Sequence, residues 1–173
     1  KFDERIFEGK RILIVGAAAF NGEEAKILKR DQFDIIINFN GSFDNDLEFQ
    51  DSIEPSYQIL FTNLDKAPKV RALLRRTVNH VVIRIPEKNL IHLYFRYFFK
   101  AVMTRLSITT VDIAHWNEAK RYLDGYTPTQ GFLAVYLALI AGSQSVTMIG
   151  FSFFETEWVQ NHTIYSISDY KMP

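Results

Sequence analysis

The sequence predicts an α/β fold in which a mostly parallel β-sheet is covered by helices on both faces. Short apolar runs, most of them ending at a glycine, an amide or a hydroxyl residue, alternate along the chain with longer segments of helical character. The runs are continuously apolar, as is typical of parallel strands that are buried on both sides. The 173 residues, 47% of them hydrophobic, are enough for one domain with a sizeable core, and no repeat or linker divides residues 1–173.

Six of these runs have the composition of β-strands. The first reads RILIV and stops at Gly16, the second reads DIIIN and leads into an Asn-Phe-Asn-Gly sequence, and the third stops at Thr62. Pro86 stops the fourth run, and Gly150 stops the last. The predicted strands are Arg11–Val15, Asp34–Asn38, Gln58–Phe61, His80–Ile85, Ser107–Val111 and Val146–Ile149.

Five segments between these runs are predicted to be helical. In the last of them, Pro128 has the fixed φ that suits a helix entry, and Gly142 follows the helix end. The residues between them are almost wholly apolar, so we expect protein to cover this helix on most sides. Residues 42–56 are polar and acidic and are predicted to form an exposed loop. The predicted helices are Glu23–Arg30, Pro68–Arg76, Asn89–Leu106, His115–Leu123 and Phe132–Ile140.

The composition narrows the classes of function. The formal net charge is zero, so the overall charge gives no reason to expect binding to nucleic acid. There are no cysteines, which excludes disulfides, thiolate metal ligands and a cysteine nucleophile, and which fits a reducing compartment. No apolar run reaches the length of a membrane span, and the charged start KFDERIFEGKR is unlike a signal peptide. We therefore expect a cytoplasmic protein.

Small, amide and hydroxyl residues gather where the predicted strands end and where the last helix begins. The carboxyl ends of parallel strands meet in one crevice, which is where open α/β sheets bind ligands. Amides and hydroxyls suit a ribose, a base or a sugar because they both donate and accept hydrogen bonds, and a helix N-terminus offers N–H groups to an anion. The alternative is that each residue only makes a turn. The candidate ligand contacts are Gly16, Ala17, Asn38, Asn40, Asn63, Thr129, Gln130, Gly131 and Gly150.

The loop after the first predicted strand, GAAAFNG, lacks two familiar phosphate-binding patterns. It has no G-x-G-x-x-G fingerprint of dinucleotide-binding proteins, and no G-K-[ST] of a P-loop follows it. These absences argue against a nicotinamide-dependent enzyme and against a P-loop nucleotidase. Phosphate binding by the backbone of this loop stays open.

Of the four histidines, His162 is the candidate general base. It lies in VQNHTIY, in the segment expected to overhang the crevice, and an imidazole titrates near neutrality. The alternative interpretation is that His162 is a solvated loop residue. His80 and His92 are predicted to be structural, and His115 to be a surface or capping residue. No histidine pair has metal-ligand spacing, and the acidic DND at 44–46 is interpreted as part of a solvated loop, so no metal ion is predicted.

The predicted helix at 89–106 mixes aromatic residues with Arg96, Lys100 and Arg105. Such mixing occurs where a helix contacts a membrane surface or nucleic acid. Apolar positions cover most of its circumference, however, which favours a core helix or the interface of a homo-oligomer. Peripheral contact with a membrane stays an alternative.

Three segments resemble, in order and spacing, the conserved motifs of sialyltransferases. RILIVGAAAFNGEEAKIL with FDIIINFNG is similar to the first motif, TPTQGFLAVYLALIAGSQSVTMIGFSFF to the second, and NHTIY to the short histidine/tyrosine motif that follows. The nearest form is the bacterial enzyme with a single Rossmann-like domain. The resemblance implies inverting, metal-independent transfer of an acidic sugar from a CMP-activated donor, which is a substrate and not a cofactor, to a glycan or lipid-linked acceptor.

The resemblance also implies roles for particular residues. Asn40 and Asn63 match asparagines that contact the nucleotide, the turn at 129–131 matches a nucleotide-contacting turn, and His162 matches the motif histidine. Two positions depart from the pattern. Ala17 stands where the family carries an asparagine, and Phe154 stands where some members place a phosphate-binding tyrosine, for which Tyr165 is the candidate substitute.

The missing asparagine and hydroxyl favour one alternative, a module of the same fold that binds a nucleotide or a sugar without turnover. A second alternative is a structural subunit whose aromatic helix docks to a membrane or a partner protein.

Overall fold

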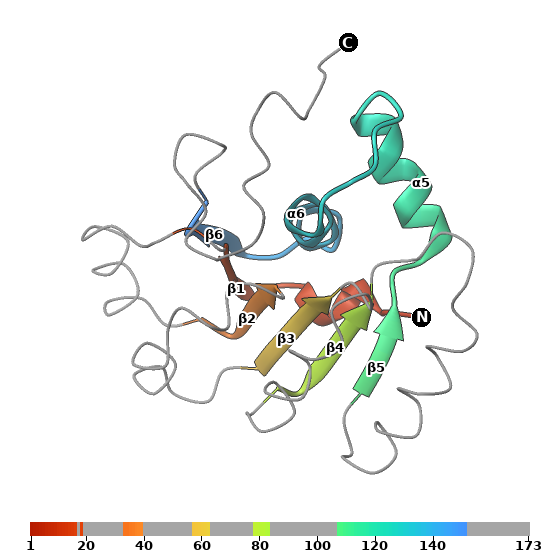
Figure 1. Cartoon of the computed structure of the whole chain (residues 1–173). Coiled ribbons are helices and arrows are strands. Elements are labelled where there is room, and N and C mark those ends of the chain that lie inside the picture. Colours follow the sequence, from red (N-terminus) through yellow and green to blue (C-terminus); the bar gives the residue numbers. More distant parts are fainter. Residues whose placement is uncertain (17, 19–32, 40–56, 63–77, 84–106, 152–173) are drawn as a thin grey trace.

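The computed structural model describes residues 1–16, 18, 33–39, 57–62, 78–83 and 107–151. These residues form a six-stranded, all-parallel sheet with helices packed on one of its faces (Figure 1). The predicted α/β class is thereby confirmed. The predicted helices at 23–30, 68–76 and 89–106 and the predicted loop at 42–56 lie outside the described residues.

The sheet has the strand order β5-β4-β3-β2-β1-β6, and every neighbouring pair is parallel. The first five strands follow one another across the sheet in one direction, and β6 returns to the far side of β1. The strand order therefore reverses between β1 and β6. The strands are β1 Arg11–Val15, β2 Ile35–Phe39, β3 Tyr57–Thr62, β4 His80–Ile83, β5 Ser107–Thr110 and β6 Ser145–Ile149.

The four central strands are buried on both faces, as their continuous apolar sequences predict. Ile14, Ile37 and Ile59 are completely inaccessible to solvent. The two strands at the ends of the described sheet are more exposed, and Met148 of β6 is 36% exposed. The prediction of a buried strand at 146–149 is therefore right about the strand and wrong about its burial. The reason is that β6 pairs with β1 on one side and has no second neighbour among the described strands.

Helix α5, Ile113–Tyr122, and helix α6, Gln130–Ile140, lie over one face of the sheet. The Thr129 side chain caps α6 by accepting a hydrogen bond from the Phe132 amide, 3.2 Å away. Leu133 and Leu137 are buried against the sheet, whereas Leu139 in the last turn is 64% exposed. The prediction that protein covers this apolar helix on most sides thus holds for its first two turns and fails for the last.

Helix α5 begins two residues earlier than predicted, because Asp112 caps it by accepting a hydrogen bond from the Ala114 amide. His115 is consequently not a cap. It lies half-buried in the first turn of α5, with its Nε2 3.7 Å from a carboxylate oxygen of Glu4.

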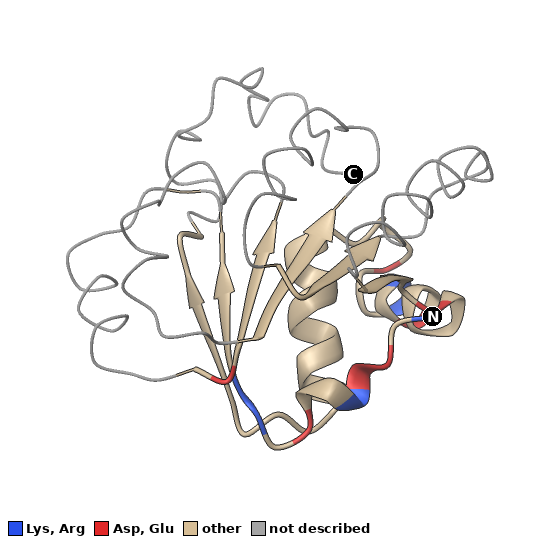
Figure 2. Cartoon of the chain, turned by 90° about the horizontal axis from the view of Figure 1, so that it is seen from below, with Lys and Arg blue, Asp and Glu red and all other residues tan. Residues whose placement is uncertain are grey.

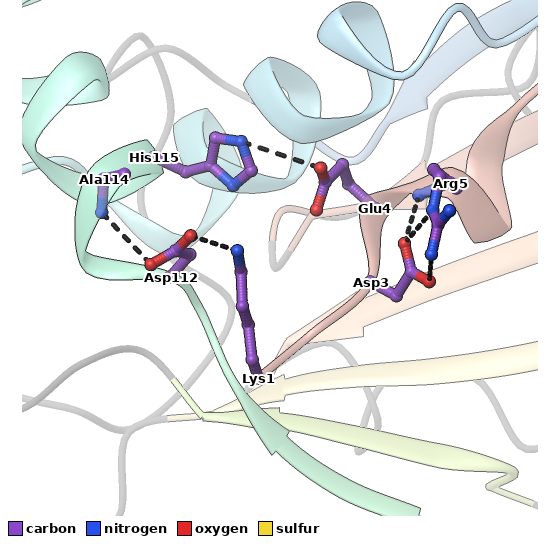
Figure 3. Close-up of polar contacts among 7 residues, drawn as sticks. All are labelled: Lys1, Asp3, Glu4, Arg5, Asp112, Ala114 and His115. Carbon is purple, nitrogen blue, oxygen red and sulfur yellow. Dashed lines mark hydrogen bonds and ion pairs between the residues drawn. The ribbon is translucent and has the colours of Figure 1, made fainter.

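Residues 1–10, which we call the N-terminal strap, cross the same face of the sheet and contain the 3-10 helix η1, Glu4–Phe7. Phe2 and Phe7 are almost inaccessible, and the Phe2 amide donates to the Thr110 carbonyl at 2.7 Å. At the other end, the Gly9 amide donates to the Gly142 carbonyl at 3.0 Å. The strap therefore joins the end of β5 to the end of α6. Its ion pairs, with α5 and within itself, are Lys1–Asp112, Glu4–His115 and Asp3–Arg5 (Figure 3).

Candidate functional site at the carboxyl edge of the sheet

The carboxyl ends of β1 and β6 lie side by side where the strand order reverses. Val15 is in register with Ile149, and the next residues in the two strands are Gly16 and Gly150. Helix α6 begins at this same edge, because Gly131 in its first turn lies against Phe151. The structure therefore brings together three of the predicted segments, those around Gly16, Gly131 and Gly150, from distant parts of the chain.

Gly16 and Gly150 are in direct backbone contact. A Cβ atom at Gly16 would lie 2.1 Å from the Gly150 carbonyl oxygen, and Gly150 has a φ of 66°. No other residue fits at Gly16 without displacing the backbone, and Gly150 has the left-handed conformation that favours glycine. Both glycines are thus explained by the packing of β1 against β6, independently of any ligand.

The two described backbone N–H groups that follow β1 are engaged in hydrogen bonds. The Gly16 amide donates to the Ile149 carbonyl at 2.7 Å, and the Ala18 amide donates to the Gly150 carbonyl at 2.9 Å. These two groups tie the loop to the end of β6. Neither points to a ligand, so phosphate binding by the backbone after β1 gains no support from the described residues.

The ring of Phe151 spans the gap between β1 and α6. A Cβ atom would lie 3.0 Å from its Cδ2 if placed on Gly16, and 3.1 Å from its Cε1 if placed on Gly131. Cδ2 and Cε1 are on opposite sides of the ring. Phe39 at the end of β2 meets the ring edge-on, with the centroids 6.3 Å apart. Sequence analysis missed Phe151 as a site residue, although its place directly after the glycine that ends β6 could have indicated it.

Thr129 is exposed at this edge and already uses one oxygen lone pair to cap α6. Its hydroxyl proton can still be donated, so Thr129 can cap the helix and contact a ligand at once. Gln130 and Gly131 are partly buried in the first turn. Among the described residues, the ends of β1, β2, β3 and β6 carry no Lys, Arg, Asp or Glu (Figure 2). An anion bound here by the described residues would rely on the helix dipole and hydroxyl groups.

Asn38 does not lie on the face that carries α6. Ile37 and Phe39 belong to the core beneath α6, whereas Ile36 packs with Leu13 and Val15 on the opposite face. Since side chains alternate along a strand, Asn38 projects to the face of Ile36, and it is only 3% exposed. The structure thus separates Asn38 from Thr129 and Gly131 by the thickness of the sheet.

The remaining predicted site residues lie outside the part of the chain that the structure describes. They are Ala17, Asn40, Asn63, His162 and Tyr165, together with Phe154.

A second polar cluster crosses the amino-terminal half of the sheet. The Nε2 atom of His80 is 2.7 Å from the Thr109 hydroxyl, its Nδ1 is 3.5 Å from the Tyr57 hydroxyl, and the Phe2 ring packs against it. Burial and, to a smaller extent, the positive N-terminus lower the pKa of His80 to about 4. The imidazole is therefore neutral at pH 7 and a weak base, which agrees with the predicted structural role.

A cavity of about 540 Å3 adjoins this cluster. Strap residues and the two sheet residues His80 and Thr109 line it. The charged groups among them are already paired, since Lys1 contacts Asp112 and Arg5 contacts Asp3. This cavity lies beside β4 and β5, on the opposite side of the sheet from β1 and β6, and contains none of the predicted site residues.

No protein-family model, no curated protein and no solved structure matches the chain significantly. Within the described ranges, no helix is long and apolar enough to cross a membrane. The same ranges hold no group of three or more His, Asp or Glu side chains placed to bind a metal ion.

Proposed function

We propose that this protein is a glycosyltransferase resembling sialyltransferases, which binds a CMP-activated acidic sugar at the carboxyl edge between β1 and β6. One observation carries the proposal. The ends of β1 and β6 and the start of α6, which the sequence singles out separately, meet where the strand order reverses. Open parallel sheets bind their ligands at such reversal points, outside the carboxyl ends of the strands.

We also propose that the sheet is doubly wound in the Rossmann-like manner, with helices on both faces. Crossover connections between parallel strands are almost always right-handed. The connections among β1 to β5 move across the sheet in one direction, and the connection from β5 through α5 and α6 to β6 moves back in the opposite direction. The helices of this last connection lie on one face of the sheet. Right-handed connections among β1 to β5 would therefore lie on the other. Leu13 and Ile36 on that other face are at most 3% exposed, which supports a second covering layer.

In this proposal the α6 N-terminus holds the donor phosphate. The Thr129 hydroxyl and the Gly131 N–H group would donate hydrogen bonds to it, and the helix dipole favours the negative charge. His162 would remove the proton from the acceptor hydroxyl, which attacks the anomeric carbon as the CMP phosphate leaves. The acceptor would be a glycan or a glycolipid, as the resemblance implies.

The proposal is tested by measuring CMP binding and then donor hydrolysis. Calorimetric titration of the full chain should show saturable CMP binding, and no binding at millimolar CMP would remove the nucleotide hypothesis. Hydrolysis of a CMP-activated sialic acid should fall by about 100-fold or more in His162→Ala, the range expected for loss of a general base. His115→Ala is the matched control and should hydrolyse the donor at the wild-type rate. A fully active His162→Ala would exclude this histidine as the base.

A second candidate is a module that binds the nucleotide or sugar without turnover. It is favoured by the engaged N–H groups of Gly16 and Ala18 and by the Phe151 ring in the gap, since both leave fewer described donors for a developing phosphate charge. This candidate predicts CMP binding with no donor hydrolysis by the wild-type chain.

A further inference from the structure

Phe151 packs at the edge of the core beneath α6 and is partly exposed. Here the neighbours on both sides are glycines, and the ring occupies the room that their missing Cβ atoms leave. The ring is thereby fixed between β1 and α6, with Phe39 behind it.

We infer that the ring of Phe151 is the surface on which the base of the bound nucleotide stacks, an inference that rests on the proposed function. The ring lies at the reversal point of the strand order and is partly exposed there. It cannot form a conventional hydrogen bond, so its contribution to a ligand is contact with a flat, apolar group. Any nucleotide base can stack on an aromatic side chain, because every base has a flat π-face.

The position of the ring also fits the rest of a nucleotide. Its Cε1 edge touches the first turn of α6, next to Thr129. A base that stacks on Phe151 would leave its ribose and phosphate beside the start of the helix. Because glycines and Phe39 hold the ring, little side-chain freedom is lost when a base binds, which favours affinity.

The test compares CMP with ribose 5-phosphate, which lacks the base, in calorimetric titrations of the full chain. Phe151→Leu keeps an apolar side chain but removes the aromatic face. It should weaken CMP binding by about 10- to 100-fold, the usual effect of removing a stacking ring, and leave the affinity for ribose 5-phosphate unchanged. Phe151→Tyr should bind CMP within about threefold of wild type, because it keeps the ring. Tyr122→Leu, which removes an exposed aromatic ring at the end of α5, is the matched control and should bind both ligands normally.

Two results would overturn the inference alone: unchanged CMP binding by Phe151→Leu, or an equal loss for both ligands. Failure of wild type to bind CMP would remove the proposed function and the inference with it. If Phe151→Leu does not fold, the wild-type complex decides the question by NMR. Nuclear Overhauser contacts between the Phe151 ring protons and cytosine H5 or H6 support stacking, and their absence in the saturated complex contradicts it.

Discussion

At the scale of single residues, the glycines show what can be predicted from the sequence and what cannot. Gly16, Gly131 and Gly150 could be singled out because they stand at strand and helix ends. The physical reason why each position requires glycine could not be predicted, since it depends on which segments meet in space. Gly16 is needed for the contact with Gly150, and Gly131 makes room for Phe151. Gly16 and Gly131 are glycines because of neighbours that are distant in the sequence, and Gly150 because of a left-handed backbone that only the fold shows.

This account predicts that Gly16→Ala is strongly destabilising. The added methyl group would lie 2.1 Å from a backbone carbonyl oxygen that cannot move without distorting the β1–β6 pair. The free energy of unfolding, measured in urea, should fall by about 3 kcal/mol. Gly9→Ala is the control, because its Cβ would meet no atom within 4 Å and only the strain of a φ of 64° remains, about 1 kcal/mol. Equal losses in the two variants would contradict the close contact.

His80 predicts a specific dependence of stability on pH. Its pKa is about 4 in the fold because of burial, against about 6.5 in the unfolded chain, so the unfolded state takes up a proton first as the pH falls. The resulting stabilisation is present above pH 6.5 and is lost between pH 6.5 and 4. Between pH 7 and pH 5 the wild type should lose about 2 kcal/mol through this group. Over the same interval, the free energy of unfolding of His80→Gln should fall by about 2 kcal/mol less than that of the wild type. Parallel pH profiles of the two proteins would show that His80 titrates normally.

At the scale of elements, the four central strands could be placed from the sequence because their apolar runs are short, rich in β-branched residues and bounded by turn residues. Their boundaries lie within one or two residues of the predicted ones where the structure describes them. The N-terminal strap was missed, because KFDERIFEGK is mostly charged and its two core residues, Phe2 and Phe7, do not follow the period of a helix or a strand. Only the folded sheet shows that these two rings enter the core.

The strap should therefore contribute substantially to stability through Phe2 and little through its ion pairs. Phe2 is 2% exposed and contacts the rings of Phe7, Phe61 and His80, so Phe2→Ala should cost about 3 kcal/mol in urea unfolding. Lys1→Gln removes an exposed ion pair with Asp112 and should leave the free energy of unfolding almost unchanged. A Phe2→Ala variant as stable as Lys1→Gln would show that the strap does not pack against the sheet.

At the scale of the whole molecule, the sequence supports the α/β class but not the order of the strands. That order follows from how each connection crosses the sheet, which composition does not record, yet it decides where the reversal point lies. The reversal between β1 and β6 is what joins the segments around Gly16, Gly131 and Gly150 into one site. The alternation of side chains along β2, and not the strand order, turns Asn38 to the other face. A cytoplasmic location, a homo-oligomer and peripheral membrane contact stay predictions.

The central claim is that the carboxyl edge between β1 and β6 binds a nucleotide. The most direct measurement is a CMP titration of the isotope-labelled full chain followed by amide NMR signals. The account predicts that the signals of Gly16, Gly131, Gly150 and Phe151 move together and saturate, while that of Gly9, which is bonded to Gly142 beyond the other end of α6, stays in place. Absence of any change at millimolar CMP, or changes confined to Asp3, His80 and Thr109 around the strap cavity, would contradict it.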